Sequence, residues 1–147
     1  MSANNVNAQV TVNINVTDIL RPNQPTVYQQ NLNPAPYLGN ALTAQQLVLN
    51  GVFSVTFPSG TAFCGMIYAR NLSPTNSTTI LMTVEYSDTN LGAFLLNGGS
   101  PDGGGFLLYY IPGTYPTSGL IFPLGISFTP SATPCPMEYA LVSNTNP

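Results

Sequence analysis

The sequence predicts an all-β protein, an antiparallel β-sandwich of jelly-roll type with an extended N-terminal arm. From residue 41 onward, short apolar runs alternate with clusters of Gly, Pro, Ser, Thr, Asn and Asp, which is typical of sandwiches and barrels. No segment after residue 50 has the periodicity of an amphipathic helix. Hydrophobic residues make up 44% of the 147 residues and aromatic residues 10%, which excludes the disordered class. The chain therefore has the material for a packed β core.

Residues 1–40 form the predicted arm. Val10, Val12, Ile14 and Val16 alternate with polar residues, so residues 9–17 are expected to form a half-buried strand. The stretch 18–40 contains four prolines, which are incompatible with a helix or an interior strand. We expect one short strand there, around Thr26 to Gln30, and thus one or two strands in the arm. A stretch of this kind is expected to cross a neighbour or to wrap its own sheet.

Residues 41–147 form the predicted β-sandwich domain. Its strands are expected at 45–49, 52–57, 62–71, 78–87, 93–96, 106–111, 120–128 and 137–143. Residues 41–49 also suit one or two helical turns, but Gly51 and the β-rich continuation favour a strand. The turn at 73–76 predicts a hairpin, whose register is fixed by the position of the turn. In that register Arg70 faces Thr79, and Glu85 faces Cys64.

The charge content limits the function. The chain has two basic residues, five acidic residues and no histidine, so that 5% of its residues are charged against about 25% in an ordinary domain. Histidine is the side chain that titrates near neutral pH, and a Ser-His-Asp triad needs it as the base. Nucleic-acid binding needs a basic surface. We therefore expect no enzyme, no catalytic residue and no nucleic-acid partner.

Two segments have a superficial likeness to ligand sites. Glu85, Asp88 and Asp102 could suggest a two-acid hydrolase or a calcium site, but Asp88 after a strand is more simply part of a turn. The stretch Gly98–Gly105 has the glycine density of a phosphate loop, but the chain lacks lysine and a strand follows. We predict no metal, no cofactor and a plain connection between strands.

The cysteines and the N-terminus suggest an intracellular origin. Cys64 and Cys135 match no metal or redox spacing, so both are predicted to be buried, unpaired thiols. The first residues lack the basic and apolar regions of a secretory signal, and no apolar run is long enough to span a membrane. Synthesis in a cytoplasm and no membrane partner are the expectation.

A set of apolar and tyrosine side chains is the candidate interface. Tyr109 and Tyr110 are adjacent in a strand and must point to opposite faces, so at least one lies outside the core. Exposed tyrosine on a surface of low charge is a suitable interface anchor, although tyrosines can also form a carbohydrate platform. The predicted interface residues are Val10, Val12, Ile14, Val16, Tyr28, Tyr37, Tyr109, Tyr110 and Tyr115.

Five segments of the predicted sandwich carry a resemblance to a known family. They are 52–61 (VFSVTFPSGT), the strand end 69–71, the paired glycines 98–99, 124–128 (LGISF) and 138–141 (EYAL). From about Gly51 to the C-terminus the chain resembles the capsid decoration, or cement, proteins of tailed phages. The long arm rich in Pro and Asn is a departure from that pattern.

The resemblance implies a structural virion protein without catalytic activity. Such a protein binds the major capsid protein on the outer capsid lattice, often as a homotrimer, and reinforces the particle, which assembles in the host cytoplasm. A phage tail or fibre component and a single jelly-roll shell protein are the structural alternatives. A carbohydrate-binding attachment module that uses exposed tyrosines is an alternative from another class.

Overall fold

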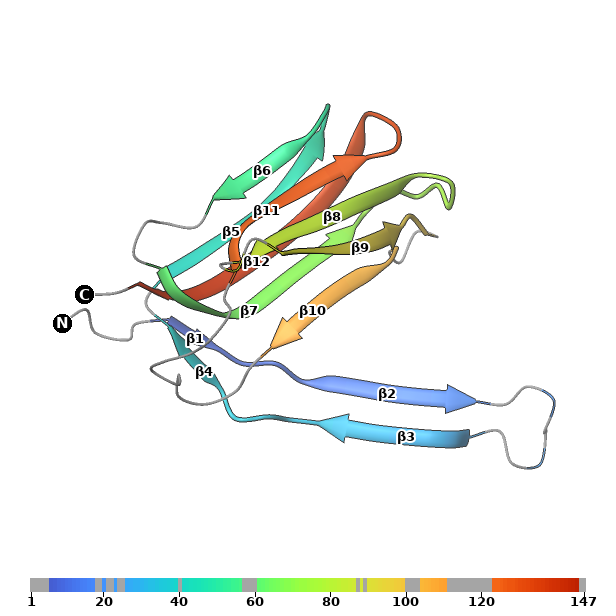
Figure 1. The fold of residues 1–147 in the computed structure, drawn as a ribbon. Coiled ribbons are helices and arrows are strands. Elements are labelled where there is room, and N and C mark those ends of the chain that lie inside the picture. The colour runs from blue at the N-terminus through green and yellow to red at the C-terminus, as the bar shows by residue number, and fades with distance from the viewer. Residues whose placement is uncertain are drawn as a thin grey trace.

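The computed structural model describes residues 6–17, 20, 23, 26–39, 41–56, 61–86, 88, 90–99, 104–110 and 123–145, with only the backbone of 61–64, 123, 144 and 145. All regular elements in these residues are β-strands, which confirms the predicted all-β class. Two antiparallel sheets of four strands pack face to face as a sandwich (Figure 1).

The two sheets are named after their central strands. The β12 sheet has the strand order β10-β7-β12-β5, and the β8 sheet has the order β6-β11-β8-β9. The strands are β5 (Ala41–Leu49), β6 (Phe53–Thr56), β7 (Thr61–Asn71), β8 (Thr79–Tyr86), β9 (Leu91–Asn97), β10 (Phe106–Tyr110), β11 (Pro123–Pro130) and β12 (Cys135–Thr145). Successive strands of the sandwich alternate between the sheets, and only β8 and β9 are consecutive strands that pair.

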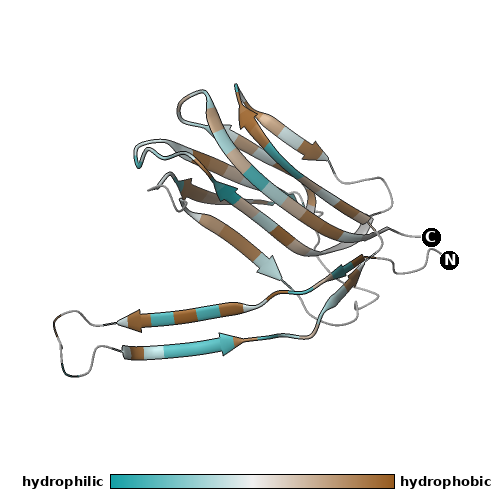
Figure 2. Cartoon of the chain, turned by 180° about the vertical axis from the view of Figure 1, so that it is seen from behind, coloured by the Kyte–Doolittle hydropathy of each residue, from teal (hydrophilic) through white to brown (hydrophobic). Residues whose placement is uncertain are grey.

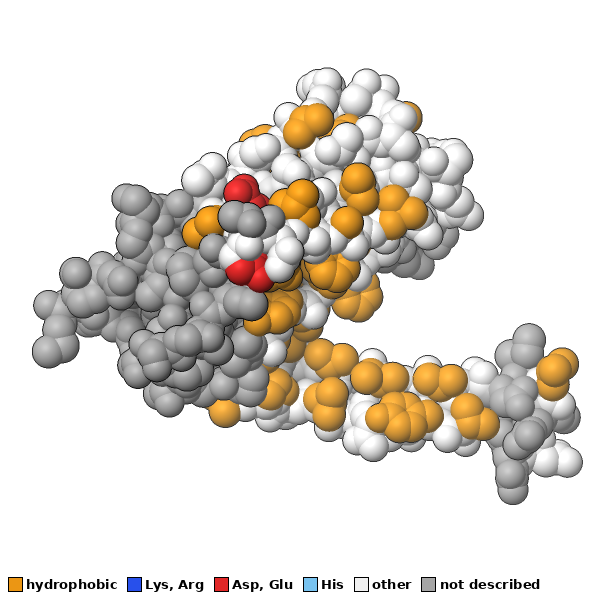
Figure 3. All heavy atoms as spheres, in the orientation of Figure 1, with side chains coloured by type: hydrophobic (Ala, Val, Ile, Leu, Met, Phe, Trp, Pro, Cys, Tyr) orange, Lys and Arg blue, Asp and Glu red, His pale blue; other side chains and the backbone are white. Residues whose placement is uncertain are grey.

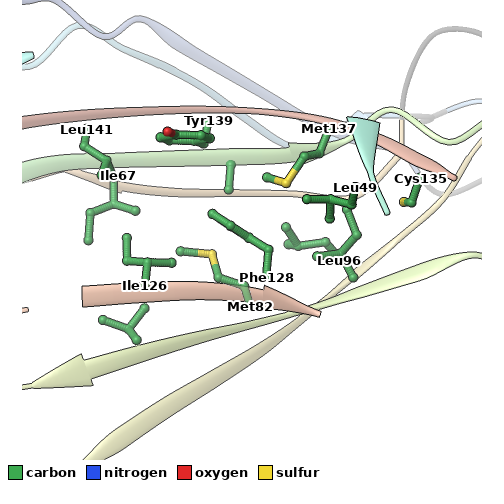
Figure 4. Packing of buried hydrophobic residues seen from close by; sticks show 13 residues of the cluster. Leu49, Ile67, Met82, Leu96, Ile126, Phe128, Cys135, Met137, Tyr139 and Leu141 are labelled. Atoms are coloured by element: carbon green, nitrogen blue, oxygen red, sulfur yellow. The ribbon is translucent and has the colours of Figure 1, made fainter. Parts of the chain in front are cut away.

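The alternation of side chains along each strand builds the core. In β8, Ile80, Met82 and Val84 are buried, while Leu81 and Glu85 are exposed on the other face. The side chains that fill the space between the sheets are Leu49, Ile67, Ala69, Ile80, Met82, Val84, Leu96, Ile126, Phe128, Cys135, Met137, Tyr139 and Leu141 (Figure 4). None of these core side chains is charged.

Three aromatic rings join the sheets at the centre of this core. Phe128 lies 6.5 Å from Phe53 and 5.7 Å from Tyr139 between ring centroids, and Phe53 lies 5.9 Å from Tyr139. Tilted and offset rings at such distances contribute about 0.5 to 1.5 kcal/mol per pair beyond the burial of their area. Phe128 is fully buried and is the centre of the group.

The eight strands predicted after residue 40 are all present, and their ends agree within a few residues. Residues 41–49 form a strand, as expected, and not a helical turn. Cys135 is buried and unpaired, as predicted, and burial raises the pKa of its thiol. The side chain of Cys64 lies outside the described residues.

The predicted hairpin between β7 and β8 is wrong, because these two strands belong to opposite sheets. Arg70 lies opposite Glu138 of β12, and Glu85 lies opposite Leu91 of β9. Each of β7 and β8 has two neighbours in its own sheet, which use its backbone hydrogen bonds on both sides. Residues 72–78 therefore cross from one sheet to the other. The overturned pairs are Arg70 with Thr79 and Glu85 with Cys64.

A buried asparagine holds this crossing in place. Asn71 is fully buried at the end of β7, and its Nδ2 donates to the carbonyl oxygens of Thr78, at 3.0 Å, and Leu96, at 2.9 Å. Its Oδ1 accepts a hydrogen bond from the backbone N–H of Ser73 at 2.9 Å. One side chain thereby links β7 to the ends of β8 and β9. Leucine in its place would remove all three of these hydrogen bonds at a buried position.

The glycine-rich connection packs against the same crossing. The N–H of Gly98 donates to the Thr78 carbonyl at 2.7 Å, and the N–H of Gly104 to the Asn71 carbonyl at 3.2 Å. A Cβ atom at Gly98 would collide with the carbonyl oxygen of Thr75, so only glycine allows this close approach. At the described ends of the segment, these N–H groups are engaged within the chain. This agrees with a connection between strands.

The arm contains four described strands where we expected one or two. They are β1 (Val6–Ala8), β2 (Val12–Thr17), β3 (Thr26–Leu32) and β4 (Tyr37–Gly39). β1 pairs with β4 and β2 pairs with β3, both antiparallel, so the arm is one ribbon folded back on itself. Figure 1 shows β1 and β4 beside the sandwich, and β2 and β3 extending away from it as a long hairpin. We call β1 and β4 the base, and β2 and β3 the hairpin.

The described residues contain no helix that could cross a membrane.

Candidate interaction surface

The base is fixed to the outer face of the β12 sheet. Tyr37 and Ala8 of the base form a small core with Val142 of β12, and Val6, Met66 and Tyr110 pack around it. The Tyr37 side chain is 1% exposed, and its ring lies directly over Gly65 of β7, where a Cβ atom would overlap the ring. The absence of a side chain at Gly65 creates the seat for this tyrosine.

Hydrogen bonds complete the attachment of the base. The Tyr110 hydroxyl lies 2.6 Å from the carbonyl oxygen of Ala35, between β3 and β4, and 3.0 Å from that of Ala8 in β1. It can donate its proton to either carbonyl. Where the base continues into the hairpin, Gln9 Nε2 donates to Asn33 Oδ1 at 3.1 Å and to the Pro34 carbonyl at 3.0 Å. The hairpin thus leaves the body from a fixed anchor.

The hairpin has one apolar face and one polar face. Residues directly opposite in an antiparallel pair share a face, and the pairing sets Val12 against Leu32 and Val16 against Tyr28. Ile14, between the two valines, faces Gln30. The opposite face carries Asn13, Asn15, Gln29 and Asn31. Figure 2 shows the alternation along β2 as brown and teal bands.

The apolar face of the hairpin is uncovered. Ile14 is 37% exposed, Val16 47% and Tyr28 51%, although the alternating pattern is that of a half-buried strand. Figure 3 shows these hydrophobic side chains as a row along the hairpin. A two-stranded sheet without a covering layer is marginally stable in water. The hairpin therefore presents an apolar face that the described part of this chain leaves exposed.

The apolar row is continuous with the buried base. Val6, Ala8, Val10, Val12, Ile14 and Val16 follow one another at every second position. Their exposure rises outward, from buried at Ala8, through intermediate at Val10 and Val12, to exposed at Ile14 and Val16. The inner part of the row is seated on the chain's own β12 sheet, and the outer part extends beyond it.

The outer face of the β12 sheet beyond the base is neutral and partly apolar. Ala140 of β12 lies opposite Ala44 of β5, and the neighbouring Leu42, which is 58% exposed, lies on the same face. Leu108 of β10 lies on this face as well, opposite Tyr68 of β7. We call Leu42, Ala44, Leu108 and Ala140 the small-residue strip. The Tyr68 side chain lies in the same row, between Leu108 and Ala140, so the two alanines are the only adjacent small side chains of the strip.

Beside this strip, a carboxylate is surrounded by donors. Glu138 Oε1 accepts a hydrogen bond from the Tyr68 hydroxyl at 2.8 Å and lies 3.9 Å from Arg70 Nη1. Gln46 Nε2 lies 3.4 Å from Oε2. Burial, followed by the hydrogen bond to Glu138, raises the pKa of the Tyr68 hydroxyl. The ionic groups on this face are therefore paired within the chain.

The predicted interface residues divide into several groups. Val12, Ile14, Val16 and Tyr28 lie together on the apolar face of the hairpin. Val10 lies between base and hairpin, and Tyr109 is 41% exposed at the edge strand β10. Tyr37 and Tyr110 differ from expectation, because their side chains attach the arm to the chain's own sheet. Tyr115 lies outside the described residues.

Of the acidic residues singled out in the sequence, Glu85 and Asp88 belong to the described part of the chain, and Asp102 does not. Asp88 accepts hydrogen bonds from the backbone and side chain of Asn90, at 3.2 and 2.6 Å, so it belongs to a turn, in agreement with the sequence interpretation. Glu85 borders an open hollow of about 300 Å³, which is also lined by Ser54, Thr83 and Ser127. No group of three or more His, Cys, Asp or Glu side chains gathers within the described ranges.

One apolar cavity opens between the sheets at the β9 and β10 edges. It is lined by Ile67, Val84, Tyr86, Phe94, Leu107, Leu108 and Tyr109 and has a volume of about 130 Å³. Pockets for cofactors and small substrates typically have about 300 to 1,000 Å³ and several convergent polar groups. This cavity suits a single apolar side chain better than a cofactor.

Comparison with known proteins identifies no relative. No protein-family model matches the chain, and neither the curated proteins nor the solved structures include a significant match.

Proposed function

We propose that this chain is a non-enzymatic structural subunit of a virus particle, a decoration protein that attaches to the capsid lattice and reinforces it. Its partners in this proposal are the major capsid protein and further copies of itself. The observation that carries the proposal is the amphipathic hairpin, anchored at its base and uncovered on its apolar face. Among the described residues, no three His, Cys, Asp or Glu side chains gather at one site, and the hollow beside Glu85 contains a single carboxylate.

The composition of the hairpin suits assembly through apolar contact. Residues 12–17 and 26–32 contain no charged residue, so a partner meets only apolar and neutral polar groups. Burial of apolar surface contributes about 25 cal/mol per Å² before the costs of association are subtracted. Asn and Gln side chains on the other face, and the free backbone edges of the hairpin, add hydrogen bonds and allow strand addition.

Repetition on a lattice would strengthen each weak contact. A decoration protein meets many equivalent sites, and linked sites raise the effective concentration of the next contact. The fixed base supports this, because a hairpin held at a set angle loses less conformational entropy on binding than a free tail.

The test is binding to shells assembled from the major capsid protein of the phage that encodes the chain. In the deletion variant, Asn-Gly replaces residues 12–32, because this dipeptide suits the two-residue turn that closes Thr11 onto Asn33. The base and the sandwich remain, so the variant is expected to fold with unchanged core stability. We expect shells to bind the full chain in hundreds of copies and the deletion variant at background level.

The control is Leu91→Ser, a change of an exposed residue at the outer face of the β8 sheet. It leaves the hairpin intact and is expected to retain full occupancy. Equal binding of the full chain and the deletion variant would reject the hairpin as the attachment device. Absence of the full chain from intact particles would reject the decoration role.

A further inference from the structure

We infer that a second copy of this chain covers the apolar face of the hairpin, so that subunits exchange their hairpins. The inference deepens the proposed function, on which it rests for the role of the hairpin, by naming the partner that the hairpin meets first. The site that receives the hairpin is the small-residue strip on the outer face of the neighbour's β12 sheet.

The continuity of the apolar row is the first argument. Ala8, at the inner end of the row, is buried against Val142 and Tyr37 on the outer face of this chain's own β12 sheet. The part of that face around Val142, Met66 and Tyr110 is therefore already complementary to a strand with this pattern of side chains, and the strip adjoins it. The outer end of the row, Ile14 and Val16, has the same chemistry and needs the same kind of surface.

The strip provides such a surface. Ala44 and Ala140 lie opposite each other, Tyr68 borders Ala140 on its other side, and Leu42 is 58% exposed on the same face. Large apolar side chains of the hairpin can pack against small side chains of the strip, as the inner faces of two packed sheets do. A hairpin lying here would add a third layer, as the base does a few residues away.

Charge gives the second argument. The two strands of the hairpin have no charged residue, and the charges beside the strip, Arg70 and Glu138, are paired with each other. Neither surface would have to bury an unpaired charge on contact, which is the main electrostatic obstacle to association. The hairpin and the strip would therefore form a contact without net charge on either side.

Area is the third argument, and it favours exchange over a single contact. The four exposed apolar side chains of this face, Ile14, Val16, Tyr28 and Leu32, and the less exposed Val12 present about 300 Å² at about 60 Å² each, so one hairpin on one strip buries roughly 600 Å² in total. That is the size of a crystal contact, whereas stable interfaces begin near 1,200 Å². A subunit that both gives and receives a hairpin makes two such contacts and reaches about 1,200 Å².

The experiment measures the mass of the purified full chain in solution, without capsid protein, by sedimentation equilibrium. We expect a dimer in which each subunit gives and receives a hairpin. The double variant Ile14→Asn with Val16→Asn and the single variant Ala44→Glu change the hairpin and the strip separately, at exposed positions that leave the core intact. Each is expected to weaken association about 100-fold. Asn15→Thr, on the polar face, is the control and is expected to keep the oligomer.

The outcomes separate this inference from the proposed function. A monomeric full chain at about 100 μM, or an oligomer that survives the hairpin and strip variants, overturns hairpin exchange. A monomer that binds shells through its hairpin leaves the decoration role standing and assigns the hairpin to the capsid protein. An oligomer that loses its contacts as expected but never binds shells supports the exchange and rejects the decoration role.

Discussion

The sandwich body and the hairpin contain the same alternating pattern, yet only the body buries its apolar face. β8 places Ile80, Met82 and Val84 against a second sheet, whereas β2 places Ile14 and Val16 toward open space. Alternation specifies that a strand has an apolar face, and it does not specify which molecule covers that face. The two regions therefore differ in whether the chain itself covers the apolar face of its strands.

The largest expected difference between the regions is in core stability. Phe128→Ala removes a fully buried ring from the aromatic group that joins the sheets and is expected to lower the free energy of unfolding by about 4 kcal/mol. The matched change Tyr28→Ala in the hairpin is expected to lower the free energy of unfolding of the isolated subunit by less than about 0.5 kcal/mol. Chemical denaturation followed by far-UV circular dichroism measures both. Similar losses of stability in both variants would show that the apolar face of the hairpin is covered as well as the core is.

Asn71→Ala tests whether the sandwich depends on the hydrogen bonds of the buried Asn71 side chain as well as on its apolar core. The change leaves two buried carbonyl groups and the Ser73 N–H without their side-chain partner, so we expect a loss of about 3 kcal/mol. Asn15→Ala in the hairpin is the matched control and should be nearly neutral, because its side chain is exposed. An unchanged free energy of unfolding for Asn71→Ala would show that water replaces the hydrogen bonds of this side chain.

A smaller effect is expected where the two regions meet. Tyr110→Phe removes the hydroxyl that donates to the backbone between the base and the hairpin, at a cost of about 1 kcal/mol. Hydrogen exchange should accelerate in residues 6–8 and 37–39 and stay unchanged in β8 and β12. Tyr28→Phe serves as the control. Uniform acceleration over the whole chain would mean that base and body unfold together.

The smallest effect concerns alkaline pH. Burial raises the pKa of Cys135 above its ordinary 9.0, and burial raises the pKa of Tyr139 and Tyr68 above 10.0. The unfolded chain then releases these protons at lower pH than the folded chain, so stability is complete below about pH 9 and falls as pH rises through the folded-state values. Thermal melts from pH 7 to 11 measure this. Stability that rises above pH 9 would contradict the assigned burial.

Local patterns predicted the strands well because each strand carries its own alternation and each turn its own Gly or Pro. They failed where the outcome depended on distant partners. The turn at 73–76 resembles a hairpin turn, but Asn71 reaches Leu96, and that contact is not visible in the local sequence. Pairing of β7 with β12 rather than β8 follows from such long-range contacts.

The interface residues show the same division. Val12, Ile14, Val16 and Tyr28 could be selected from alternation and composition, and they lie on one face. Tyr37 looked equivalent in the sequence, yet its ring fits over Gly65 and attaches the base. A glycine within an otherwise regular strand was the available signal, since it often marks the close approach of another group. The partner of that glycine could not be read from the sequence.

The seat of the base on β12 determines how the protein would carry mechanical load. A pull on the hairpin passes through Tyr37 and Ala8 to Val142, in a strand flanked on both sides by long antiparallel ladders. The chain also continues from β4 into β5, an edge strand that pairs with β12 along its whole length. A pull on the hairpin is therefore shared between the packing of the base on β12 and the ladder between β5 and β12.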